Sequence, residues 1–195
     1  MAIENQMLDK LSRTFELELP LRESMDDYLD LIIPNIRPWG DDLYEYEEKD
    51  YFETRWLEIR ESEDFHESML HIFNQDNEYL ISIDGDIYKG SWRIFEKSNT
   101  MIIERIAGGS IAKSELYDLA YLSRDFFILK KHGDQSRKGH RRYFVMGRES
   151  VVKNLEWRDV VELLFNEYRS GNSSFTTIAV VIAIAILAFL IFSML

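Results

Sequence analysis

Residues 78–96 read EYLISIDGDIYKGSWRIFE and predict two antiparallel strands joined by a tight turn. In the first strand, Tyr79, Ile81 and Ile83 occupy alternate positions, so their side chains share one face. In the second strand, a tryptophan and an isoleucine alternate with an arginine and a phenylalanine. The central Asp-Gly-Asp sequence is typical of a two-residue hairpin turn. A cation site is the alternative for its aspartates, but Ca²⁺ needs roughly six or more oxygen ligands.

The same succession of strand-like runs and turn signals extends over residues 50–149. Short strands at near-even spacing indicate an antiparallel meander, because tight turns join antiparallel neighbours. Eight strands can close into a barrel whose interior is filled by side chains or holds one small ligand. We therefore expect a mainly β fold, an eight-stranded antiparallel meander or barrel with flanking helices. The predicted strands are Phe52–Glu61, Ser68–Phe73, Glu78–Ile83, Ile87–Phe95, Thr100–Ile106, Lys113–Leu122, Phe126–Lys131 and Arg141–Met146.

Four short motifs follow one another in this region: Thr54-Arg-Trp56, residues 71–79, Gly90-Ser-Trp92 and residues 116–129. Their order resembles that of the lipocalin-like (calycin) β-barrel domains found in many bacterial proteins. Those domains have a G-x-W opening strand, an aromatic hairpin, a second G-x-W strand and a hairpin around a serine-aspartate turn. Thr54 stands where the first motif has glycine. The resemblance implies an eight-stranded barrel but no single function, because such domains are functionally diverse.

The last stretch of the sequence, Phe175 to Leu195, has 21 residues without a charge, proline or glycine. A helix of this length spans about 30 Å, the thickness of a bilayer's hydrocarbon core. We therefore predict one C-terminal transmembrane helix, with a buried core helix as the alternative. The start of the sequence shows no signal-peptide pattern. We expect a tail-anchored, single-pass protein whose N-terminal domain is cytoplasmic, in a bacterial inner membrane.

Helical periodicity indicates helices on both sides of the barrel. Ser24 is expected to cap a helix that runs through Ile33 and is stopped by Pro34. Residues 156–168 carry an apolar stripe, which is expected to pack on the barrel; a partner-binding helix is the alternative. The expected organisation is an N-terminal extension (1–49), a barrel domain (50–149), an amphipathic helix with a linker (150–170) and a transmembrane helix (175–195).

The composition limits the classes of function. The chain of 195 residues has a net charge of −12, which argues against nucleic-acid binding because phosphates need clustered cations. It contains no cysteine, and so has no disulfide or thiolate metal site. His66 and His71 are one residue too far apart for the zinc-protease H-E-x-x-H pattern. With no nucleophile–base pair in view, we expect no enzyme, no metal and no cofactor.

Two sets of side chains are candidates for binding. Aromatic residues could line a small-ligand site inside the barrel, although filling the core is the ordinary role of such residues. Cations between residues 130 and 142 could face an anionic membrane or an acidic partner, each gaining about 1 kcal/mol near the membrane; a solvated hairpin tip is the alternative. The aromatic set is Trp56, Phe73, Tyr79, Trp92, Phe95 and Phe127, and the basic set is Lys130, Lys131, Arg137, Lys138, Arg141 and Arg142.

These features lead to two hypotheses about function. The first is a membrane-anchored, non-enzymatic interaction or scaffold protein, an accessory subunit of a bacterial membrane-associated assembly. It would contact the lipid bilayer through residues 175–195 and bind a protein partner in a membrane complex. The second is a binding module that holds a small apolar ligand inside the barrel.

Overall fold

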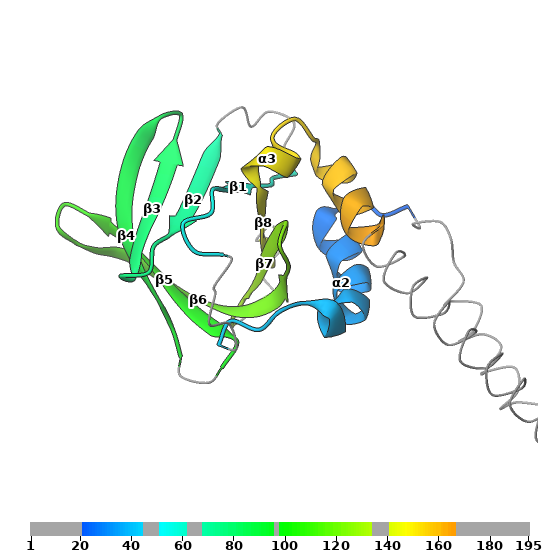
Figure 1. The fold of residues 1–195 in the computed structure, drawn as a ribbon, viewed down its shortest axis with the longest axis horizontal. Helices are drawn as coiled ribbons and strands as arrows, with labels where there is room; N and C mark the ends of the chain where they lie inside the picture. The colour runs from blue at the N-terminus through cyan, green and yellow to red at the C-terminus, as the bar shows by residue number, and fades with distance from the viewer. Residues whose placement is uncertain (1–20, 45–50, 62–67, 96–97, 134–140, 167–195) are drawn as a thin grey trace, which may run out of the picture.

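A computed structural model describes residues 21–44, 51–61, 68–95, 98–133 and 141–166. Eight antiparallel strands form a closed barrel in sequence order, and the last strand pairs back onto the first (Figure 1). The mainly β, eight-stranded barrel is thus confirmed, and it is compatible with a lipocalin-like fold. The strands are β1 (Trp56–Glu58), β2 (Met69–Phe73), β3 (Glu78–Ile83), β4 (Asp86–Ile94), β5 (Thr100–Ala107), β6 (Ser110–Leu122), β7 (Phe126–Lys131) and β8 (Tyr143–Arg148).

The strand bounds differ most from the prediction at β1, which has three residues where a run from Phe52 to Glu61 was expected. Glu53 has a φ of 53°, a left-handed conformation that interrupts an extended strand. Phe52 forms only an isolated bridge, to Phe73. The predicted turn at Asp84-Gly85 is confirmed, with positive φ at both residues, as a two-residue hairpin turn requires.

The barrel interior holds one of two apolar clusters. Trp56, Phe73, Tyr79 and Phe127 are almost completely buried there and pack ring against ring. Gly90 on β4 makes this packing possible, because a Cβ atom at that position would lie 2.2 Å from the carbonyl oxygen of Glu104 and 2.9 Å from the Tyr79 ring. The interior is therefore filled by side chains at this level.

The second cluster lies on the outer face of β6, β7 and β8, where helix α2 (Met25–Ile36) packs. The Ser24 hydroxyl caps α2 by accepting a hydrogen bond from the Asp27 amide at 3.2 Å, as predicted. The predicted stop at Pro34 is wrong, because α2 continues to Ile36 and leads into the 3₁₀ helix η1 (Arg37–Trp39). Proline has no backbone N–H group to donate a helical hydrogen bond. The helix continues because Ile36 is fully buried and holds the last turn against the barrel.

The chain leaves the barrel through the short helix α3 (Glu149–Val152) and a helical segment over residues 157–166. Val160, Val161 and Leu164 of this segment are buried in the outer cluster beside α2, as the apolar stripe predicts (Figure 1). Within the described residues, no helix combines the length and the apolar character that crossing a bilayer requires. The predicted transmembrane helix, residues 175–195, lies outside the described residues.

Candidate functional site at the barrel mouth

Charged side chains gather at one end of the barrel, which we call the mouth. It is the end at which β3 turns into β4 and β5 turns into β6. A pocket of about 140 Å³ opens there. Its lining comes from β1, β5, β6, β7 and the start of β8, and consists of Glu58, Arg105, Lys113, Glu115, Tyr117, Lys131, Arg141, Arg142, Tyr143 and Phe144.

A chain of buried hydrogen bonds leads from this pocket into the barrel. His71 Nε2 lies 3.2 Å from a Glu58 carboxylate oxygen, and His71 Nδ1 lies 2.5 Å from the Tyr79 hydroxyl. A carboxylate can only accept, so Nε2 carries a proton. In the neutral imidazole, Nδ1 then accepts a hydrogen bond from the Tyr79 hydroxyl, and the ring is held in one tautomer. Glu58 also accepts hydrogen bonds from Arg60 at 2.7 Å and from Arg141 at 3.2 Å.

Burial and charge set the protonation of these groups. Burial lowers the pKa of His71 below its ordinary 6.5, against the opposing effect of the Glu58 carboxylate. Burial alone would raise the pKa of Glu58, but hydrogen bonds from His71 and Arg60 outweigh it and bring that pKa to about 2. Burial also raises the pKa of Tyr79, and the nearby positive charge of Arg105 opposes this rise. At neutral pH the site holds an ionised Glu58 beside a neutral His71.

Because His71 is buried, we expect the free energy of unfolding to depend on pH. Because the pKa of His71 is lower in the folded chain than 6.5, the unfolded chain binds the proton more tightly. Stability is therefore expected to fall as the pH drops from 6.5 towards 5.5, and H71Q should remove this part of the fall. Urea unfolding of the full chain in a mild non-ionic detergent at both pH values measures it. H132Q, at an exposed histidine, is the control; an equal fall in H71Q and the unaltered chain would contradict the expectation.

The structure separates the predicted aromatic set. Four of its members lie in the filled interior already described, and Trp92 is buried with them at 4% exposure. Phe95 is 49% exposed, on the outside of the barrel beyond the end of β4. These rings do not line the pocket at the mouth, where every lining side chain except Phe144 is charged or polar.

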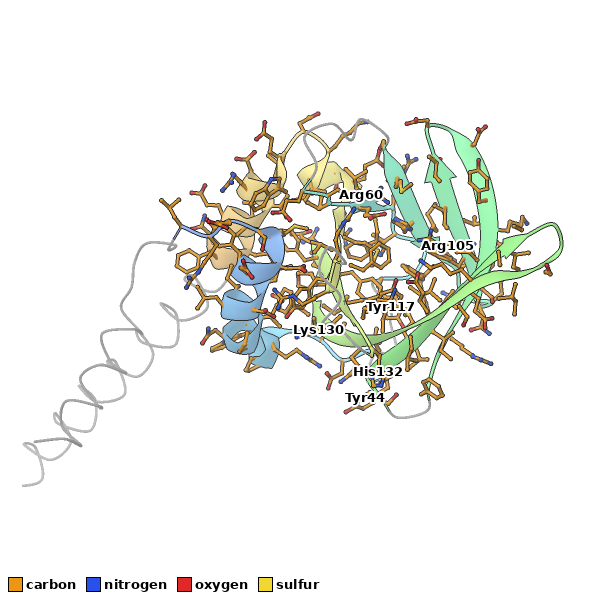
Figure 2. All side chains as sticks on the ribbon, turned by 180° about the vertical axis from the view of Figure 1, so that it is seen from behind. Tyr44, Arg60, Arg105, Tyr117, Lys130 and His132 are labelled. Atoms are coloured by element: carbon orange, nitrogen blue, oxygen red, sulfur yellow. The ribbon has the colours of Figure 1, made fainter. Side chains whose placement is uncertain are left out.

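The predicted basic set makes contacts within the protein wherever it is described. Lys131 Nζ lies 2.5 Å from a Glu115 oxygen, and Arg141 pairs with Glu58 at the mouth. Lys130 lies beside α2, 3.6 Å from an Asp30 oxygen (Figure 2). Arg137 and Lys138 lie outside the described residues. Contact of the basic set with a membrane or an acidic partner stays a prediction.

Arg142 joins α2 to the barrel through hydrogen bonds and ion pairs. Its backbone amide donates to Asp26 at 2.8 Å, and its guanidinium contacts Asp26, Asp27 at 3.1 Å and Asp30. The Tyr143 hydroxyl donates to Asp30 at 2.7 Å. One arginine thus contacts three carboxylates on the first turns of the helix.

Replacing Arg142 with alanine is expected to lower the free energy of unfolding by about 2 kcal/mol, typical for hydrogen bonds to charged groups. The three aspartates would then repel one another on α2. Hydrogen exchange of the α2 amides should accelerate more than exchange of the barrel strands. R93A is the control, because Arg93 is 66% exposed and reaches its partner only at 4.0 Å. Unchanged exchange in α2 would show that the helix is held by apolar contacts alone.

Sequence reasoning did not identify Glu58, Arg105, Glu115 and Tyr117 as site residues, and it considered His71 only in an imperfect zinc pattern and in the hairpin motif of residues 71–79. The available signal was strand alternation. Glu58 follows Trp56 on the inward face of β1, and Arg105 occupies the next inward position of β5 beyond the buried Ile103. Comparisons with protein-family models, curated proteins and solved structures found no match. The site therefore has to be interpreted from the chemistry of its own residues.

Proposed function

We propose that this protein is a membrane-anchored, non-enzymatic interaction protein of the lipocalin-like (calycin) type, in which the barrel is a rigid platform. The observation that carries the proposal is the filled interior. Phe73 alone has ring centroids of Tyr79, Trp92 and Phe127 at 5.0, 5.9 and 5.5 Å. An apolar ligand would have to displace this packing, which supports an interaction role over a carrier of apolar ligands.

Anchoring completes the proposal. A single apolar helix over residues 175–195 would hold the barrel at a bilayer, where its concentration near membrane partners is high. The accessory subunit of a bacterial membrane-associated assembly is the class of protein that fits. The charged mouth is then one surface available for a partner.

Purification from native membranes in a mild detergent tests the proposal. We expect the full chain to recover one protein partner in stoichiometric amount, and a variant lacking residues 175–195 to recover at least tenfold less. The urea midpoint of the barrel should be the same in both. Recovery of the full chain in aqueous extracts, away from vesicles, would contradict the anchoring. A bound apolar small molecule in place of a protein would favour the alternative function.

A further inference from the structure

The mouth pocket is positively charged in an otherwise acidic protein. Five cationic side chains and two carboxylates line it, although the whole chain has a net charge of −12. Arg142 is balanced by the aspartates of α2, outside the pocket. Among the lining residues, the other four cations have Glu58 and Glu115 as counter-charges, so the cations exceed the carboxylates there by two.

Of these four cations, Arg105 is the one that has no partner among the described residues. Lys113 and Lys131 both pair with Glu115, at 2.9 and 2.5 Å, and Arg141 pairs with Glu58. Among the described residues, no ion pair or hydrogen bond joins the guanidinium of Arg105 to a neighbour. Its strand position is the inward one, and its register partners are Gly90, which has no side chain, and Lys113. Arg105 is half-buried, and an unpaired charge that is partly removed from water is costly unless a ligand neutralises it.

Neither carboxylate of the mouth is available to neutralise Arg105. Glu58 and Glu115 have side-chain exposures of only 7% and 10%, and each already holds two cations. Moving either one to Arg105 would break existing ion pairs. An anion from outside is the alternative, and the pocket is open to solvent along Lys113 and Lys131, whose side chains are 54% and 44% exposed.

We propose that the mouth binds a small dianionic oxyanion, a phosphate group, with Arg105 as its principal contact. The planar guanidinium matches two oxygens of such a group, and the exposed lysines add point charges. Two charges on the anion match the two unbalanced cations. The pocket, about 140 Å³, is smaller than the roughly 300 Å³ at which pockets for drug-sized ligands begin. This inference does not depend on the proposed interaction function.

Calorimetric titration of the full chain with inorganic phosphate, in a non-ionic detergent at constant ionic strength, tests the site. We expect saturable binding, with R105M weakening the affinity at least tenfold. R93M is the matched control, because Arg93 lies on the adjacent strand with its side chain 66% exposed, and it should bind as the unaltered chain does. Adding phosphatidic acid to the micelles distinguishes two sources of the group: competition with phosphate indicates a lipid headgroup, and no competition indicates a free anion.

A second measurement separates a binding role of Arg105 from a structural one. Without phosphate, R105M is expected to raise the melting temperature, because it removes an unpaired cation beside Lys113. With saturating phosphate, only the unaltered chain and R93M should gain further stability. Binding no stronger than that of chloride would overturn the proposal. So would equal phosphate affinity in R105M, or a loss of stability in R105M without phosphate.

Discussion

Replacing Phe127 with alanine is expected to lower the free energy of unfolding by about 3–5 kcal/mol, the range for a fully buried aromatic ring. Phe127 has no exposed surface, and its ring lies 5.5 Å from Tyr51, 5.7 Å from Trp56 and 5.5 Å from Phe73 between centroids. Trp56 and Phe73 are held on strands of the closed barrel, so they cannot collapse into the space left by the ring. Urea unfolding of the full chain in a mild detergent measures the loss.

Phe95 provides the matched control, because the same substitution there removes a ring that is 49% exposed. F95A should change the free energy of unfolding by less than about 0.5 kcal/mol. The F127A cavity should also admit benzene, which would raise the melting temperature of that variant and leave the unaltered chain unchanged. Stabilisation of the unaltered chain by benzene would show that its interior already has room, and would favour the apolar-ligand hypothesis.

The barrel could be predicted because its signal is local. The alternation of apolar and polar residues along a strand, like the turn residues after it, involves only neighbouring positions of the sequence. A meander also pairs strands that are adjacent in sequence. The short β1 could not be predicted, because the left-handed backbone at Glu53 has no glycine to announce it. Likewise, α2 continues beyond Pro34 because Ile36 packs in the outer cluster. Such a tertiary contact cannot be deduced from the start and stop signals of a helix.

The mouth depends on contacts that local patterns do not contain. Glu58 and Arg141 are 83 positions apart, and the closing of β8 onto β1 brings them together. At one end of the barrel, the inward positions of the strands change from apolar to charged residues. The alternation of residues along each strand shows this change once the pairing of the strands is known. Likewise, the contacts of Arg142 with α2 join residues more than 110 positions apart. Only the register of the folded barrel places these charges.

Replacing Glu58 with alanine is expected to lower the free energy of unfolding by about 3 kcal/mol, the lower end for breaking a buried ion pair. The carboxylate is 7% exposed and holds His71, Arg60 and Arg141 together. Arg141 can turn to water because it is 42% exposed, but the imidazole of His71 is fully buried and would lose its acceptor. The matched control is E78A, which removes a pair with the exposed Lys89 and should cost less than about 1 kcal/mol.

The pH dependence identifies the carboxylate as the cause. The pKa of Glu58 is about 2 in the folded chain, against an ordinary 4.5, because hydrogen bonds from His71 and Arg60 outweigh burial. The folded state therefore releases this proton more readily than the unfolded state does. The stabilisation is complete above pH 4.5 and disappears as the pH falls through 2. The difference in stability between E58Q and the unaltered chain should accordingly be largest near neutral pH and shrink between pH 4.5 and 2. A difference that stayed constant over this interval would mean that Glu58 acts by its shape and not by its charge.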